Sequence, residues 1–419
     1  MLPTEGRHSR ISRARRDRER SNSSACSRGV RRRLTLLALA SATASCGAIA
    51  SGPSDSSGGA SGTDDAGTSV IVKQVTVGRS ISCALLSDGT VKCWGYNADG
   101  QIGIDHGCLS TSRAGNCNPL WATSPVTVQG LSGAVRIDAG YDTVCAVLGD
   151  GTARCWGNND GGKLGDGTTT DNASPVMVQG LSNVAAVAAR TSCALLEDGT
   201  VSCWGRGNLT PVVVQGLSGV LGVTGGLHTC ALLSEGTVAC WGSNQYGELG
   251  DGTNIDRVTP VVVPGLSGVV EITGNGAHTC ARLNEGTVRC WGANGYGQLG
   301  DGTNDDRSTP VTVQGLSDII ETSAGGQPAE YGAQTCARLA NRTLACWGSF
   351  RGPEDLVPIV ANGVVDSAVG IGAIDATGTH TCALLQDNTV MCWGDNLYGQ
   401  LGNGTRTSSP TPVFVQGLL

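Results

Sequence analysis

The stretch His278–Gly302 reads HTCARLNEGTVRCWGANGYGQLGDG, and versions of it occur seven times in the 419-residue chain. Every version contains two cysteines ten positions apart, and the second cysteine always opens a Cys-Trp-Gly triplet. The pairs are Cys83 and Cys93, Cys145 and Cys155, Cys193 and Cys203, Cys230 and Cys240, Cys280 and Cys290, Cys336 and Cys346, and Cys382 and Cys392. This repetition predicts a fold assembled from seven similar supersecondary units.

Each cysteine pair brackets a segment that reads as a two-stranded hairpin. In Ser82–Gly95, SCALLSDGTVKCWG, short runs containing Val, Thr and Trp, which favour strands, flank a Ser87-Asp88-Gly89 turn. When Cys83 faces Cys93, these three residues form the loop, whose last position takes a left-handed backbone and favours glycine. The other units hold Gly151, Gly199, Gly236, Gly286, Arg342 and Asn388 there.

The same register places the two cysteines of each pair opposite each other. If Leu86 and Thr90 form a hydrogen-bonded pair, Cys83 and Cys93 form a non-hydrogen-bonded pair with Cα atoms about 4.5 Å apart, at the short end of the disulfide range. We therefore expect seven cross-strand disulfides, each closing a loop of about eleven residues and contributing roughly 2–3 kcal/mol. Buried reduced thiols and zinc ligands are the alternatives, although the spacing is not that of a zinc finger or ribbon.

Residues 1–46 end in a segment typical of an export signal. Val30-Arg31-Arg32-Arg33 precedes the apolar run Leu34–Ala40, then small residues and Cys46. This order is typical of a secretory signal peptide, and the apolar run is too short to span a bilayer. Thr43-Ala44-Ser45-Cys46 resembles a bacterial lipobox, although Thr43 stands where an aliphatic residue is usual. The resemblance implies cleavage before Cys46 and lipid attachment to it, and export would favour the disulfides.

One alternative for this N-terminus is ordinary secretion. The other is a basic tail for nucleic-acid binding or nuclear import, but that interpretation leaves the apolar run unexplained. Residues 1–46 hold 11 of the 28 lysines and arginines and 3 of the 35 aspartates and glutamates, so the remainder has a net charge of −15. So acidic a remainder argues against nucleic acid as a partner. Residues 47–68, rich in Gly, Ser and Asp, read as a flexible linker.

Each unit within residues 69–419 has room for four strands. An apolar opening segment such as Val269–Ile272 precedes the hairpin, and the glycine-rich Asn294–Thr303 and a closing strand at Pro310–Leu316 follow it. Seven such units of about 50 residues predict an all-β, seven-bladed β-propeller, because no unit buries both of its faces without neighbours.

These units resemble the repeat of the regulator of chromosome condensation family. His228–Thr253 reads HTCALLSEGTVACWGSNQYGELGDGT, which is similar to the family's His-Thr start, Trp-Gly-x-Asn centre and Gly-Gln-Leu-Gly end. The resemblance covers Ser69–Leu419 and implies a seven-bladed propeller whose chain ends meet within one blade. The paired cysteines resemble the bacterial exported branch, which is similar to the propeller-type beta-lactamase inhibitory proteins.

Three units depart from the pattern. In regular units we expect the Gly-Gln-Leu-Gly-Asp-Gly-Thr segment to pack blade against blade, but units three and six lack it. Unit one carries an insertion after Gly103, with Cys108 and Cys117, which we expect to pair, and Trp121. Unit six has an enlarged opening that contains Tyr331.

No pattern indicates a metal, cofactor or catalytic site. The turns Asp251–Asp256 and Asp301–Asp306 lack the glutamate and ligand spacing of an EF-hand. His228, His278 and His380 occupy equivalent positions in different units, so we expect structural hydrogen bonds rather than one shared site. No serine elbow, HExxH helix or phosphate-binding loop is present in the sequence.

The leading hypothesis is a monomeric lipoprotein of the bacterial envelope, held at the outer membrane only by its lipid, that binds a protein or a glycan. Guanine-nucleotide exchange by family analogy is the first alternative, although an exported chain would not meet a cytoplasmic GTPase. An exported carbohydrate-active enzyme is the second. A specific partner should bind where the repetition breaks, which makes Trp121 and Tyr331 the candidate binding residues. Alternatively, Trp121 packs on its own blade and the insertion is merely tolerated.

Overall fold

The computed structural model describes residues 69–105, 120–274, 276–327, 332–348, 359–360, 371–377 and 379–419. The predicted signal peptide and linker, together with Cys46, Cys108, Cys117 and Tyr331, lie outside these residues. All described residues belong to the compact unit Ala40–Leu419. Within them, no helix has the length and apolar character needed to cross a membrane.

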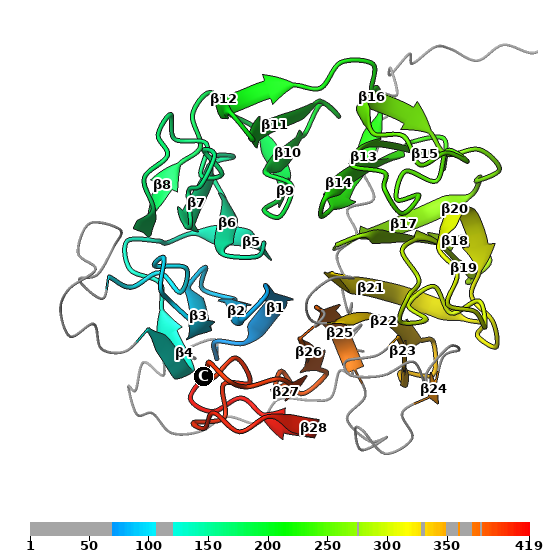
Figure 1. Cartoon of the computed structure of the whole chain (residues 1–419). Helices are drawn as coiled ribbons and strands as arrows, with labels where there is room; N and C mark the ends of the chain where they lie inside the picture. Colours follow the sequence, from blue (N-terminus) through cyan, green and yellow to red (C-terminus); the bar gives the residue numbers. More distant parts are fainter. Residues whose placement is uncertain are drawn as a thin grey trace, which may run out of the picture. The chain divides into compact units, whose positions relative to one another are not determined.

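Seven four-stranded antiparallel sheets follow one another along the chain (Figure 1), and each is one blade. Blades 1 and 2 consist of β1 (Val72–Val77), β2 (Ile81–Leu86), β3 (Val91–Tyr96), β4 (Trp121–Thr127), β5 (Ala134–Ala139), β6 (Thr143–Leu148), β7 (Ala153–Gly157) and β8 (Asn172–Met177). Blades 3 and 4 consist of β9 (Val184–Ala188), β10 (Cys193–Leu196), β11 (Val201–Gly205), β12 (Asn208–Val213), β13 (Val220–Gly225), β14 (His228–Leu233), β15 (Val238–Gly242) and β16 (Arg257–Val262). Blades 5 to 7 consist of β17 (Val269–Gly274), β18 (His278–Leu283), β19 (Val288–Gly292), β20 (Arg307–Thr312), β21 (Ile319–Gln327), β22 (Gly332–Leu339), β23 (Leu344–Trp347), β24 (Ile359–Val360), β25 (Ile371–Ala376), β26 (His380–Leu385), β27 (Val390–Gly394) and β28 (Ser409–Phe414).

The predicted seven-bladed β-propeller is confirmed, but the expectation that the chain ends meet within one blade is wrong. Blade 1 contains only β1–β4, and blade 7 contains only β25–β28. The first unit supplies its own first strand and the last unit its own last strand, so each sheet is complete without a strand from the other end. Lateral bonds join the two blades instead, including Val77 N to Asp375 Oδ2 at 2.9 Å and Gly404 N to Thr123 O at 2.9 Å.

The stapled hairpin is also confirmed. Cys83 faces Cys93 across β2 and β3, and the two form a disulfide with a Cα–Cα distance of 4.1 Å. The backbone amide of Leu86 donates to Thr90 O at 2.8 Å, and Gly89 has a φ of +81°. Arg342 adopts the same left-handed conformation with a φ of +70°, which a non-glycine residue adopts at some cost in free energy.

The six other predicted cysteine pairs are disulfides of the same geometry, with Cα–Cα distances of 4.0 to 4.1 Å. Every one of them crosses the central hairpin of its own blade, as predicted from the register. They join Cys145 to Cys155, Cys193 to Cys203, Cys230 to Cys240, Cys280 to Cys290, Cys336 to Cys346, and Cys382 to Cys392. The alternatives of reduced thiols and zinc ligands at these positions are therefore wrong.

The hydrophobic core lies between neighbouring blades. One buried cluster combines Val72, Val75 and Trp94 of blade 1 with Leu384 and Leu401 of blade 7. Such shared clusters are expected of a propeller, since a single sheet exposes both of its faces until a neighbour covers them.

Candidate functional site

Blades interlock through a four-residue segment, Gly-x-Leu-Gly, that follows the hairpin. At the junction of blades 4 and 5, Leu249 is fully buried, and the carbonyl of Glu248 accepts a hydrogen bond from Trp291 Nε1 at 2.8 Å. A Cβ on Gly247 would lie 2.5 Å from Ser308 Cα, and one on Gly250 would lie 2.8 Å from Trp291 Nε1. Both positions therefore require glycine.

Four other junctions repeat this contact. The bonds run from Trp94 to Gln400 O, Trp156 to Gln101 O, Trp204 to Lys163 O and Trp347 to Gln298 O, at 2.6 to 3.1 Å. The residues equivalent to Leu249 are Ile102, Leu164, Leu299 and Leu401, all buried. These contacts confirm the prediction that the segment packs blade against blade.

At two junctions, a side-chain hydroxyl donates a second hydrogen bond to the carbonyl oxygen that accepts from the tryptophan. Ser82 Oγ donates to Gln400 O at 2.8 Å, and Thr335 Oγ1 donates to Gln298 O at 2.8 Å. Each hydroxyl residue lies directly opposite the donating tryptophan in its own hairpin, as Ser82 faces Trp94. The hairpin register therefore aims two donors at one oxygen atom.

The junction between blades 3 and 4 lacks the segment, because β11 ends at Gly205 and β12 begins at Asn208. Thr229 and Trp241 of blade 4 face each other across β14 and β15, as the donor pairs do elsewhere. In the described part of the chain, neither their hydroxyl nor their indole N–H has a hydrogen-bond partner. Both residues line a groove of about 500 Å³.

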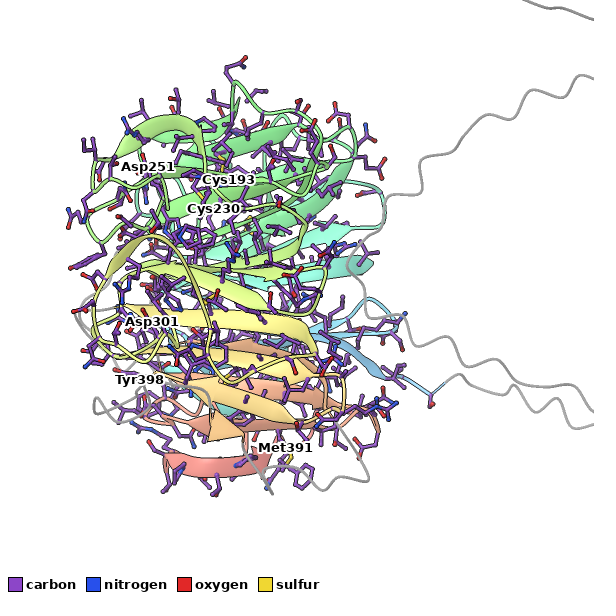
Figure 2. All side chains as sticks on the ribbon, turned by 90° about the vertical axis from the view of Figure 1, so that its right-hand side faces the viewer. Cys193, Cys230, Asp251, Asp301, Met391 and Tyr398 are labelled. Atoms are coloured by element: carbon purple, nitrogen blue, oxygen red, sulfur yellow. A yellow bond between two sulfur atoms is a disulfide. The ribbon has the colours of Figure 1, made fainter. Side chains whose placement is uncertain are left out.

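Two valines of the blades that flank this groove are more exposed than the regular junctions would leave them. Val258 is 96% exposed, whereas its equivalents that lie beneath a preceding loop are buried or half-buried: Thr123, Ala173, Leu209 and Ser308. Val212, which pairs with Cys203 as Val261 pairs with Cys240, is 54% exposed. Cys203 is itself half-buried, although Cys240 is fully buried. Figure 2 labels Cys193 and Cys230, the first cysteines of the two blades that flank the groove.

Charged groups near the groove are held by the fold. Arg257 forms an ion pair with Asp251 at 3.0 Å, and Asp256 Oδ1 accepts a hydrogen bond from Asn244 N at 2.8 Å. Burial alone would raise the pKa of Asp251, but hydrogen bonds from Thr253 and Arg257 hold it below its usual value. Arg206 donates to Leu227 O at 2.9 Å. The groove therefore combines two neutral donors and apolar side chains with charged groups that the fold already engages.

The central channel contains a second cluster of polar groups. Its wall includes Asp138, Arg190 and Asp375, which line a cavity of about 150 Å³. Burial raises the pKa of Asp138 to about 7. The carboxylates of Asp138 and Asp375 accept backbone hydrogen bonds from the next blade, namely from Ala189 N at 2.7 Å and Val77 N at 2.9 Å. These carboxylates therefore join blades.

Six blades contribute such a joining side chain, at the position opposite the first cysteine of the blade. Its oxygen accepts a hydrogen bond from a backbone N–H of the next blade; the residues are Thr76, Asp138, Thr224, Thr273, Ser323 and Asp375. Blade 3 has Ala188 there. The ring of bonds is therefore interrupted between blades 3 and 4, at the same junction as the groove.

The three histidines also join blades. His228 lies 2.5 Å from Thr279 Oγ1, His278 lies 2.9 Å from Thr335 Oγ1, and His380 lies 2.8 Å from Ser82 Oγ, in each case through Nε2. Burial lowers the pKa of His228 and His380 to about 4 and that of His278 to about 3. The neutral imidazoles serve as structural partners, in line with the sequence interpretation.

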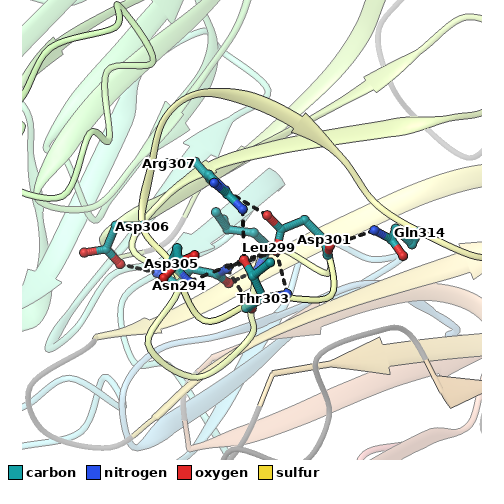
Figure 3. A network of polar contacts seen from close by, with 8 residues as sticks. All are labelled: Asn294, Leu299, Asp301, Thr303, Asp305, Asp306, Arg307 and Gln314. Atoms are coloured by element: carbon teal, nitrogen blue, oxygen red, sulfur yellow. Dashed lines mark hydrogen bonds and ion pairs between the residues drawn. The ribbon is translucent and has the colours of Figure 1, made fainter.

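The aspartate-rich turns are held by their own loops. In Figure 3, Asp301 accepts hydrogen bonds from Asn294, Thr303 and Arg307, with the Arg307 Nε to Asp301 Oδ2 distance at 2.8 Å. Asn294 Oδ1 also accepts from Leu299 N at 2.9 Å. Among the described residues, no group of His, Cys, Asp or Glu side chains is arranged to hold a metal ion.

Of the predicted partner-binding residues, only Trp121 can be placed. It is half-buried at the start of β4, and the guanidinium of Arg406 lies 4.1 Å from its ring centroid. Trp121 thus packs against a loop of blade 7. The sequence interpretation missed Thr229, Trp241 and Val258, although the shortened unit three was the signal that pointed to them.

Family models for the "Regulator of chromosome condensation (RCC1) repeat" match the chain. One matches residues 72–101, 134–163, 269–298 and 373–400, and the other matches 150–194, 235–282, 285–327 and 387–419. Beyond residue 72, the unmatched stretches are 102–133, 195–234 and 328–372. They include the places where units one, three and six depart from the repeat, but 195–234 also contains β13 and β14 of blade 4, and 328–372 reaches the start of β25.

Curated relatives share part of the propeller. "E3 ubiquitin-protein ligase HERC2" of Homo sapiens is 34% identical over 112 residues, covering 26% of this chain and 2% of that protein. "Protein pim1" of Schizosaccharomyces pombe is 29% identical over 111 residues, covering 26% of this chain and 21% of that protein. The chain thus spans less than a quarter of the length of either relative.

The crystal structure of human WBSCR16 superposes with a TM-score of 0.50 at 17% identity, covering 82% of this chain and 81% of that one, which shows a shared fold. The ranges matched by the family models together include more than half of the 419 residues, and they are spread over the blades of the propeller. The chain therefore belongs to the regulator of chromosome condensation repeat family.

Proposed function

We propose that this protein is an exported, lipid-anchored binding module of the bacterial envelope that holds a protein partner in the groove between blades 3 and 4. The observation that carries the proposal is the half-buried Trp241 beside the exposed Val258, at a junction that lacks its interlocking segment. Tryptophans in well-packed, desolvated pockets are favoured anchors at interfaces. The module acts as a monomer, and the proposal includes no catalytic step.

The disulfides support the location. Seven disulfides indicate an oxidising, extracytoplasmic compartment, because cytosolic thiols are kept reduced. The lipid anchor rests on the sequence around Cys46 alone. Replacing Cys46→Ala should move the protein from the membrane to the soluble fraction, and unchanged membrane association would contradict the anchor without touching the groove.

A protein partner fits the groove better than a glycan. The two neutral donors occupy the positions that receive a main-chain carbonyl at the other junctions, and they share the groove with the apolar Val258. A glycan would bring many hydroxyl groups, each of which loses water on binding and needs a partner of its own.

Photo-cross-linking in intact cells tests this site. A photoreactive amino acid at Val258 should give a defined, protease-sensitive adduct, because that side chain lies at the rim of the groove. The control position is Phe414, which is 56% exposed on β28 and does not line the groove. Equal adducts from both positions, no adduct from Val258, or a protease-resistant glycan adduct would contradict the proposal.

A further inference from the structure

The interlocking segment of the regular blades indicates, by analogy, which chemical groups a ligand of the groove should carry. At the junction of blades 7 and 1, the carbonyl of Gln400 receives Trp94 Nε1 and Ser82 Oγ, both at 2.8 Å. At the junction of blades 5 and 6, the carbonyl of Gln298 receives Trp347 and Thr335 at 2.9 and 2.8 Å. One main-chain oxygen therefore satisfies two donors of the next blade.

Blade 4 presents the same two donors without an acceptor. Thr229 and Trp241 are fixed opposite each other by the β14–β15 register, and Thr229 is only 8% exposed. Unit three provides no loop carbonyl here, and it has Thr191 where three other junctions have a histidine facing the hydroxyl. Both donors line the groove and have no acceptor in the described part of the chain, so the site favours a ligand that brings a carbonyl oxygen to replace the water they would otherwise bind.

The apolar residues Cys203 and Val212 indicate which side chain should follow the carbonyl group in the ligand. In blade 4, Leu249 covers the disulfide at Cys240 and packs with Val261. In blade 3 the corresponding surface consists of Cys203 and Val212, half-buried and exposed. A leucine fits such a surface, and an isoleucine does as well, since Ile102 takes this role in blade 1.

The ligand backbone would pass so close to the protein that the residues on either side of that leucine must be small. The glycine before it runs against the outer strand of the next blade, where the groove has Val258, and the glycine after it meets the tryptophan edge. At the regular junctions a Cβ at either position would lie 2.5 to 2.9 Å from its nearest neighbour, so the glycines are steric requirements.

We propose that the groove binds a Gly-x-Leu-Gly turn of a partner protein, which completes the junction between blades 3 and 4 as the chain's own segments complete the others. This inference rests on the proposed function and names the chemistry of the partner. The turn places its x carbonyl on Thr229 and Trp241, its leucine on Cys203 and Val212, and its first glycine on Val258. The donors assigned to the turn are the neutral Thr229 and Trp241, because Arg206 and Arg257 already bond to other groups of the protein.

The test uses a cyclic peptide copied from this chain, Tyr246–Thr253 (YGELGDGT), carrying a fluorophore, and the full-length exported protein. Fluorescence anisotropy should show saturable binding to the wild-type protein. Thr229→Val and Trp241→Phe should each weaken binding about 5- to 30-fold, as expected for one lost hydrogen bond that leaves its partner desolvated. Thr309→Val, which removes an exposed hydroxyl outside the groove, should leave the affinity unchanged.

Two altered peptides distinguish specific recognition of the turn from nonspecific binding. Peptides with alanine in place of the leucine, or valine in place of the glycine that follows it, should lose binding. Equal binding of all three peptides, or equal affinity of the Thr229→Val, Trp241→Phe and wild-type proteins, would overturn the inference. Urea unfolding of each variant checks that the propeller remains folded.

The outcomes distinguish the two proposals. Specific cross-linking from Val258 without peptide binding would overturn the Gly-x-Leu-Gly ligand while leaving the protein-binding groove intact. A concentration-dependent dimer that is lost in Thr229→Val would assign the groove to a second copy of this chain and contradict both. Peptide binding with the predicted loss in the variants would support the ligand directly.

Discussion

The indole N–H of Trp94 donates a hydrogen bond to the carbonyl of Gln400, which is 2.8 Å away and 306 positions later in the chain. This bond joins blade 1 to blade 7 in the way that Trp291 and Glu248 join blades 5 and 4. The propeller thus closes with the repeat's own junction rather than with an exchanged strand. Where one unit omits the segment, the same junction becomes a groove.

The interlocking leucine should matter more for stability than the exposed valine at the groove. Leu249→Ala should lower the free energy of unfolding by about 2–5 kcal/mol, since Leu249 is fully buried between two blades. Val258→Ala removes an exposed side chain and should change it by no more than about 0.5 kcal/mol. Urea unfolding curves measure both, and similar losses would show that the groove is already packed.

The Cys193–Cys203 disulfide beside the groove should be reduced more easily than the Cys230–Cys240 disulfide of the next blade. Cys203 is half-buried and lines the groove, whereas Cys230 and Cys240 are fully buried. Thiol–disulfide exchange requires access of the attacking thiolate to a sulfur atom. Under mild reductant without denaturant, mass spectrometry should detect alkylation at Cys193 and Cys203 before Cys230 and Cys240. Simultaneous labelling in the folded protein would contradict this order, and labelling in urea is the control.

Acid should weaken the junction that His380 bridges. Burial lowers the pKa of His380 from 6.5 to about 4, so the unfolded chain binds a proton at a pH where the folded protein does not. The stability due to the neutral imidazole is complete above pH 6.5 and is lost as the pH falls towards 4. The loss amounts to as much as roughly 3 kcal/mol. Urea unfolding at pH 7 and pH 4.5 should show a smaller pH dependence for His380→Gln than for the wild type, and equal dependence would refute this assignment.

The interrupted ring of bonds in the central channel should be repairable. Ala188 lines the central cavity and faces the first cysteine of blade 3. In the six other described blades, the residue at this position has a side-chain oxygen that bonds to the next blade. Ala188→Ser should supply an acceptor for Gly225 N and raise the free energy of unfolding by about 0.5–1.5 kcal/mol. Ala188→Val adds bulk without an acceptor and is the matched control. Equal effects of the two substitutions would show that filling space, not hydrogen bonding, changes the stability.

The hairpins and their disulfides could be predicted from the sequence because the contacts are local. Cys83 and Cys93 are ten residues apart, and the turn at Gly89 alone sets which residues face each other. The interlocking role of the glycine-rich segment was predictable as well. Its glycines recur at positions where neither strand propensity nor core packing explains them.

The groove and the closure of the ring could not be predicted in the same way. Trp241 carries the same triplet as Trp291, and nothing near it in the sequence distinguishes the two. Its indole lacks an acceptor because the preceding blade, not its own, omits the segment. Likewise, Trp121 packs under Arg406 of blade 7, a neighbour that the sequence of unit one does not indicate.

The sequence by itself determined the repeated unit, the strand register and the cysteine pairing, since each depends on residues within one hairpin. The tertiary structure alone decided which donors remain unpaired and how the ring closes. Those properties arise between blades, where residues such as Thr229 and Trp241 depend on what the adjacent unit places opposite them. A local pattern fixes a side chain's direction, but only the neighbouring blade determines whether that side chain meets a partner.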